Sequence, residues 1–138
     1  MTGVVAHPFR PARQIIVIGA DTAVVVDKTI LGKPADDEEA AAMLRQLSGR
    51  SHEVMTGLSL RPGAREVRHV ETTLVHFAAL SGDQIAWYVQ SGEGHDKAGG
   101  YAIQGLASKF IERIDGCYFN VMGLPVALVY RHLKESFL

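Results

Sequence analysis

The stretch IIVIGADTAVVV, residues 15–26, is aliphatic except for one carboxylate, Asp21, near its centre. Its β-branched residues are typical of a buried strand, and we interpret it as two runs, 15–19 and 22–26, interrupted at Gly19-Ala20-Asp21. Burying an unpaired carboxylate in such a sheet would cost several kcal/mol. Asp21 is therefore the first candidate for a functional residue.

The residues after this stretch predict a return of the chain and then a helix. Asp27-Lys28-Thr29 indicates a turn, and Pro34 ends any pairing of the short run that follows it. The acidic run at residues 36–39 is typical of a helix start, because carboxylates cap the first turn and favour the positive end of the helix dipole. We prefer this interpretation of the run to a metal cluster. An apolar stripe predicts the buried face of the helix, at Ala40, Met43, Leu44 and Leu47.

The middle of the chain predicts a long antiparallel hairpin. Residues 51–60 and 66–77 are extended in pattern and are joined across Arg61-Pro62-Gly63-Ala64, a strong turn signal. His69 and His76 are seven residues apart and should fall on opposite faces of the second strand, which argues against a shared metal.

The second half of the chain predicts a helix, a glycine-rich loop, a strand and a final helix. Ser81 and Gln84 form a capping-box pattern before a helix that Gly92 ends, and the glycine-rich segment 91–105 indicates a loop shaped for close approach of the backbone. A strand is expected at 110–114, and Pro125 should begin a helix. Its inward side chains should be Leu128, Val129, Leu133 and Phe137. The fold class is therefore α/β, a mixed β-sheet flanked by helices, with an irregular lead-in at 1–14 and a single domain at 15–138.

Composition excludes several partners. Fourteen Lys and Arg against fifteen Asp and Glu give a net charge of -1 without any basic block, so we expect no nucleic-acid polymer as a partner. We also expect no membrane partner, because no segment has the length and apolarity of a membrane span and the first residues do not resemble an export signal. The single cysteine, Cys117, favours a cytoplasmic protein and is more typical of a small core residue than of a nucleophile.

A few polar residues lie beside glycines or at the ends of apolar runs, where no cap, turn or helix start explains them. They are Asp21, Lys33, Asp96, Lys97 and Gln104. Carboxylates bind hard divalent metals and lysines neutralise phosphate oxygens, so this set is compatible with a site for a polyanion and a metal. Surface charges around turns would explain the same pattern, and residue pattern alone leaves the two interpretations level.

Five motifs give the chain a resemblance to a known family. GADTAVV, ILGKP, LSGRSHEVMTGL, GEGHDKAGGYAIQG and YFNVMGLPV occur in the order that is typical of the Maf family of nucleoside triphosphate pyrophosphatases. The resemblance implies a Maf-like, inosine-triphosphatase-like fold, a homodimer and a divalent metal, Mg or Mn. It also implies hydrolysis of a nucleoside triphosphate to the monophosphate and pyrophosphate, and its Ala-Asp-Thr and Tyr-x-Ile-Gln-Gly segments resemble the branch that acts on dTTP and UTP.

The resemblance also implies roles for individual residues. Asp21 would be the proton acceptor and the carboxylate linked to the metal, and Lys33 would bind phosphate. Thr22 and Gln104 would help to select the base, while Asp96 and Lys97 would support substrate binding from the Asp-Lys-Ala-Gly segment.

The family's Ser-x-Arg-Arg phosphate loop has no counterpart here, since Arg10 and Arg13 lie in Pro-flanked sequence and do not reproduce it. We therefore expect an N-terminally truncated fold that turns over dTTP and UTP much more slowly than a complete relative. Three interpretations stay open: a member with weak catalysis, an inactive module that binds nucleotides or a protein, and a chain whose start omits coding sequence.

Overall fold

The computed structural model describes residues 2–6 and 15–136. Their helices and strands, in chain order, are β1 (Thr2–Ala6), β2 (Ile15–Val26), β3 (Thr29–Leu31), α1 (Asp37–Leu47), β4 (Ser51–Pro62), β5 (Val67–Phe77), α2 (Gly82–Ser91), the short 3-10 helices η1 (Ala98–Gly100) and η2 (Leu106–Phe110), β6 (Ile111–Asp115), α3 (Tyr118–Met122) and α4 (Val126–Ser136).

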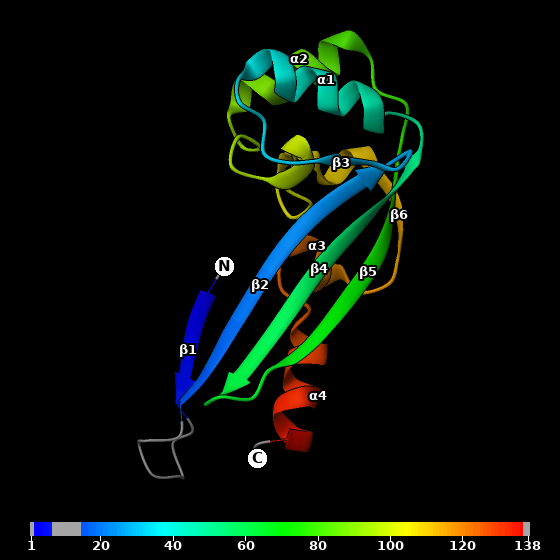
Figure 1. Cartoon of the computed structure of the whole chain (residues 1–138). Coiled ribbons are helices and arrows are strands. Elements are labelled where there is room, and N and C mark those ends of the chain that lie inside the picture. The colour runs from blue at the N-terminus through cyan, green and yellow to red at the C-terminus, as the bar shows by residue number, and fades with distance from the viewer. Residues whose placement is uncertain (1, 7–14, 137–138) are drawn as a thin grey trace.

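The sheet has the strand order β1-β2-β4-β5-β6, and β3 also pairs with β2. Figure 1 shows β2, β4 and β5 as long, twisted strands, with α1 and α2 at one end and α4 beside the other. Every strand pair that the structure describes is antiparallel. The α/β class is confirmed, but the expected mixture of parallel and antiparallel strands is not found among the described strands, all of whose pairs are antiparallel.

β2 is one continuous strand of twelve residues, so the predicted interruption at Gly19-Ala20-Asp21 is wrong. Ten consecutive residues of β2, from Ile16 to Val25, face partners in β4. The polar centre of the segment is accommodated because the partner of Asp21 is Gly57, which has no side chain. A single charged residue in an aliphatic strand thus places a polar side chain on the surface of the sheet and does not interrupt the strand.

The helices pack on one face of the sheet and form two apolar clusters. The larger cluster joins α1 and α2 to the ends of β2, β4 and β5 that carry Val24, Val54 and Val75. The smaller cluster joins α4, through Leu128 and Val129, to the other end of the same strands. Between the clusters the strands carry threonines on this face, and α3 packs there. The sheet therefore has an apolar section at each end and a polar section between them.

Most of the predicted local structure is confirmed. Asp36 caps α1 by accepting the Glu39 amide, and the four predicted apolar residues of α1 are buried. The hairpin of β4 and β5 forms, Ser81 and Gln84 make the predicted capping box, and Leu128 and Val129 face inward from α4. His69 and His76 point to opposite faces, since His69 lies against the ring of His132 and His76 contacts Ser51.

The structure differs from expectation near the N-terminus of the described chain. Thr2–Ala6 of the expected irregular segment form β1, which pairs with residues 15–19 of β2. Two consecutive β-branched residues, Val4 and Val5, favour this extended backbone. Residues 7–14, with Arg10 and Arg13, and Phe137 lie outside the described residues. None of the described helices has the length and apolar character that crossing a membrane requires.

Candidate functional site

A cavity of about 220 Å³ brings together five of the six predicted site residues. Asp21 and Thr22 come from β2, Lys33 follows β3, and Asp96 and Lys97 come from the glycine-rich loop. Ala20, Ala98, Met122 and Gly123 complete the lining. Residues that are up to 76 positions apart in sequence thus share one small cavity. Their roles stay predictions, but their proximity is a property of the fold.

The cavity lies where two strands share one edge of β2. β4 occupies the other edge of β2 at residues 16–25, so β1 and β3 both pair on the remaining edge. β1 reaches residue 19 and β3 begins at residue 24, and residues 20–23 lie between these two paired stretches. Among the described residues, Asp21 and Thr22 of β2 therefore lie on a stretch of this edge that is paired with neither β1 nor β3.

The Asp21 side chain is exposed, which removes the energetic problem that its sequence neighbours pose. Residues alternate between faces along a strand, so Asp21 points away from the apolar clusters while Ala20 points into one of them. Asp21 also lines a second, open hollow of about 700 Å³ with Gly57 and Arg68. Asp21 is thus an exposed residue that lines two hollows.

Arg68 is paired with a carboxylate in that second hollow. Its Nε donates to Glu66 Oε1 at 2.8 Å, and Ser59 donates to the same oxygen at 2.8 Å. These hydrogen bonds, that of Arg68 first, lower the pKa of Glu66 to about 2. Arg68 therefore already has an anionic partner in this hollow.

Lys33 and Lys97 bring two ammonium groups to the cavity from segments that the backbone ties together. The Gly99 amide donates to the carbonyl of Gly32 at 3.0 Å, which joins the glycine-rich loop to the segment before Lys33. Lys97 Nζ lies 4.0 Å from Asp96 Oδ1, at the limit of an ion pair. Two cations near an exposed carboxylate are suited to a ligand that carries several negative charges.

Thr22 points to the helix side of the sheet and belongs to a buried polar network. Its Oγ1 lies 3.0 Å from Thr56 Oγ1 and 3.5 Å from the carbonyl oxygen of Gly123. Asn120, fully buried on α3, donates to the carbonyls of Val54 and Glu71 at 3.1 and 3.2 Å. The network fixes α3 on the sheet, and α3 in turn places Met122 and Gly123 at the cavity.

Gln104, the sixth predicted residue, is not among the residues that line this cavity. It lines a separate hollow of about 300 Å³ together with Tyr118 and Arg113. Tyr118 begins α3 and Met122 ends it, so the two cavities lie at opposite ends of a helix that is about 7 Å long at 1.5 Å per residue. The residue predicted to select the base therefore lies in a different hollow from the one that Lys33 and Lys97 line.

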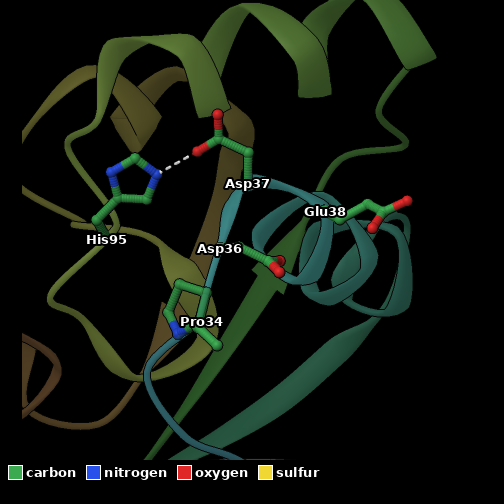
Figure 2. Close-up of a pocket in the computed structure, with 6 residues that line it drawn as sticks. Pro34, Asp36, Asp37, Glu38 and His95 are labelled. Carbon is green, nitrogen blue, oxygen red and sulfur yellow. Dashed lines mark hydrogen bonds and ion pairs between the residues drawn. The ribbon is translucent and has the colours of Figure 1, made fainter.

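An acidic hollow of about 650 Å³ lies next to the cavity, at the start of α1. Figure 2 shows His95 from the glycine-rich loop pointing toward Asp37, with 2.7 Å between Nε2 and Oδ1. Asp36 is occupied as the helix cap, which agrees with our preference for a helix start over a metal cluster. The contact of His95 with Asp37 attaches the loop to α1 one residue before Asp96.

The donor set fits a metal that the substrate helps to hold. Among the described residues, no group of three or more His, Cys, Asp or Glu is placed to bind an ion. Asp21 and Asp96 nevertheless line the same cavity, and Mg²⁺ usually binds one or two carboxylates together with substrate phosphates and water. The residues present are consistent with that arrangement rather than with a cage made of protein alone.

Sequence reasoning missed one part of the site, α3, and one buried polar contact that lines none of the described hollows. It did not predict α3, whose five residues are too few for a periodic pattern, although Gly123 with φ of 117° marks its end. It also missed His52, which is buried on β4 with Nε2 2.6 Å from the Tyr101 hydroxyl. Burial lowers the pKa of His52 to about 4 and raises the pKa of Tyr101, so both side chains are uncharged near neutral pH.

Comparison with known proteins identifies the family. The family described as "Maf-like protein" matches residues 4–136, nearly the whole chain. The chain belongs to the Maf-like family. Within it, a dTTP/UTP pyrophosphatase of Symbiobacterium thermophilum is 58% identical over 120 residues, which cover 87% of this chain and 62% of the relative.

Two other relatives also match most of this chain but only part of their own length. A dTTP/UTP pyrophosphatase of Carboxydothermus hydrogenoformans is 52% identical over 87% of this chain and 66% of its own length. One from Pyrococcus furiosus is 48% identical over 86% of this chain and 62% of its own length. The chain thus spans somewhat less than two thirds of the length of these curated relatives.

Proposed function

We propose that this Maf-like protein is a nucleoside triphosphate pyrophosphatase that converts dTTP or UTP to the monophosphate and pyrophosphate. The observation that carries the proposal is the cavity that joins Asp21 to Lys33 and Lys97. The names of the relatives, all dTTP/UTP pyrophosphatases, support the substrate class. Hydrolysis requires water to attack the α-phosphorus while pyrophosphate leaves, and each need has a candidate group in the cavity.

Asp21 would act as the general base. Its exposed carboxylate can accept a proton from the attacking water, and general-base catalysis of this kind typically contributes about 10² to 10⁴ in rate. Lys33 and Lys97 would hold the phosphates and stabilise the negative charge that grows on the leaving pyrophosphate. The tie between Gly99 and Gly32 would keep these two lysines at a fixed spacing.

Gln104 and Thr22 would select the base. An amide offers both a donor and an acceptor, which matches the N3–H and O4 edge of uracil or thymine. Gln104 lies in the hollow at the far end of α3 from the cavity that the lysines line. Binding of the base there and of the phosphates in the cavity would place a nucleotide alongside α3.

We further propose that Asp21, with Asp96 near it, would hold Mg²⁺ or Mn²⁺ together with the substrate. When bound, such a metal would supply positive charge to the phosphate oxygens. Asp96 would in addition orient Lys97, its neighbour at 4.0 Å.

The test measures pyrophosphate release from dTTP, UTP, dCTP and 7-methyl-GTP, with magnesium, with manganese and with a chelator. Release from dTTP and UTP that requires metal, and that Asp21→Asn reduces about 10²-fold or more, is the expected result. Glu53→Gln is a matched control, because Glu53 is an exposed carboxylate on β4 that lines none of the described hollows. Activity undiminished in Asp21→Asn would overturn the assignment, and saturable binding without release would indicate a nucleotide-binding module.

We also propose that the protein is a homodimer and acts in the cytoplasm. Five large apolar side chains of α3 and α4 are between 38% and 58% exposed: Tyr118, Phe119, Met122, Val126 and Tyr130. Exposed apolar side chains that gather on two successive helices favour an interface. Light scattering should give twice the chain mass, and Tyr130→Glu should shift it toward the monomer. The free thiol of Cys117 supports a reducing compartment.

A further inference from the structure

The glycine-rich loop is closed into a ring by one carboxylate, that of Glu93. The Leu106 amide donates to both oxygens of Glu93, at 2.9 and 3.0 Å, although the two residues are thirteen positions apart. The Tyr88 hydroxyl, which comes from α2, donates to Glu93 Oε1 at 2.9 Å. The same hydroxyl accepts the Ala102 amide at 2.9 Å. Glu93 and Tyr88 together hold the far side of the loop at two points.

The chain is shaped around this carboxylate. A Cβ atom added at Gly105 would lie 2.2 Å from Glu93 Oε2, which is closer than any side chain tolerates. The Tyr88 hydroxyl is buried, and this burial raises its pKa, so it stays protonated and serves as a donor to Glu93. The ring requires glycine at 105 and a hydroxyl group at 88, and the Tyr88 ring in addition packs in the larger apolar cluster against Phe110.

The two ends of the ring contribute to different hollows. Asp96 and Lys97 line the cavity with Asp21, whereas Gln104 lines the hollow with Tyr118. Glu93 itself is not among the described residues that line either hollow. Its hydrogen bonds fix the position of the Gln104 segment relative to the Lys97 segment, because the Leu106 amide is two residues from Gln104.

We propose that Glu93 is a positioning residue for nucleotide selection, which sets the spacing between Gln104 at the base and Lys97 at the phosphates. This inference rests on the proposed function and deepens it. Loss of the ring leaves both lysines and Asp21 in place, since the tie of Gly99 to Gly32 is independent of Glu93. Loss of the ring frees the segment that carries Gln104. The preference for one base over another should therefore fall more than the affinity for the phosphates does.

Three variants test the proposal: Glu93→Ala, Glu93→Gln and Tyr88→Phe. Glutamine has the shape of glutamate and keeps a carbonyl oxygen for the Leu106 amide and the Tyr88 hydroxyl. We expect Glu93→Ala to lower the ratio of kcat/KM for dTTP to kcat/KM for dCTP about tenfold or more, in line with the cost of misplacing a substrate contact by about 1 Å. Glu93→Gln should restore the ratio to within about threefold of the wild type, and Tyr88→Phe should lie between the two.

Two further measurements make every outcome informative. Calorimetric binding of dTTP and dCTP analogues with a non-hydrolysable α,β-bridge gives the same discrimination without chemistry. Hydrogen exchange at the Leu106 amide should be faster in Glu93→Ala, and not in Glu93→Gln or in the control Glu135→Ala, whose carboxylate lies exposed on α4.

The results separate this inference from the proposed function. A wild-type protein that neither binds nor hydrolyses pyrimidine nucleotides overturns the proposed function. A wild-type protein that prefers dTTP, with the same preference in a folded Glu93→Ala variant, overturns the role of Glu93 alone. Loss in Glu93→Gln as severe as in Glu93→Ala would also overturn it, because the charge rather than the shape of Glu93 would then matter.

Discussion

Acidification should destabilise this protein through one buried histidine, His52. The ring is only 2% exposed and lies edge-on to Phe77 and Tyr101, with centroids 5.3 and 5.5 Å away. Burial lowers the pKa of His52 from its ordinary 6.5 to about 4, because the imidazolium would lose its hydration in this apolar cluster. Among the residues that the structure describes, His52 Nδ1 has no hydrogen-bond partner that could compensate the charge.

The sign of the effect follows from which state binds the proton more readily. Between pH 6.5 and pH 4 the unfolded chain protonates this histidine while the folded chain does not, so stability falls as the pH falls and then levels off below about pH 4. Integrating over the two pKa values gives a loss on the order of 2.5 kcal/mol between pH 7.5 and pH 4.5. That is a large fraction of the roughly 5–15 kcal/mol that stabilises a typical domain.

Urea unfolding at pH 7.5 and pH 4.5, followed by circular dichroism, measures this loss. Other groups also titrate in the interval, so the comparison is with His52→Gln, whose amide can still bond to the Tyr101 hydroxyl but does not titrate. The drop in unfolding free energy should be smaller in His52→Gln than in the wild type by about 2.5 kcal/mol. Equal drops in the two proteins would refute the argument that His52 is buried in its neutral form.

Three further substitutions have definite expectations. Asn120→Ala should lower the unfolding free energy by about 3 kcal/mol, because the carbonyls of Val54 and Glu71 lose a buried donor; a loss below about 1 kcal/mol in urea unfolding would contradict this. Gly94→Ala should cost a similar amount, since its Cβ would lie 1.9 Å from the Gly100 carbonyl oxygen, and an unchanged melting temperature would show that the loop adapts. Lys33→Ala should raise KM for dTTP about tenfold in steady-state kinetics, and an unchanged KM would exclude a phosphate contact.

The sequence was sufficient for elements whose causes are local. The capping box at Ser81 and the cap at Asp36 depend on residues three apart, and both are present in the structure. The hairpin of β4 and β5 depends on alternation and one turn. Elements that depend on distant partners were missed or misjudged. α3 is held by hydrogen bonds from Asn120 to strands 49 and 66 residues away in sequence, and no local pattern predicts them.

The candidate site was predicted as a set of residues but not as an arrangement. Family motifs pointed to Asp21, Lys33 and Lys97, and the fold does place these three around one cavity. Gln104 was assigned to the same substrate, yet it lines the separate hollow that also contains Tyr118, at the other end of α3. The two hollows are separated by α3, a helix that the sequence did not reveal, so residue type alone could not have shown this arrangement.

The carboxylate at the centre of IIVIGADTAVVV shows why an energetic misfit is a useful signal. If β2 were covered on both faces and both edges, Asp21 would need a buried partner to repay its desolvation. The structure satisfies it in another way: Gly57 opposite leaves space, alternation turns the side chain away from the apolar clusters, and, among the described residues, neither β1 nor β3 pairs with it. A hydrated carboxylate costs the fold little, so stability gives no reason to exclude Asp21 from this strand and no reason to require it. What it does provide is an acceptor held by a continuous twelve-residue strand at a cavity that Lys33 and Lys97 also line, and that placement is the physical basis for proposing it as the catalytic base.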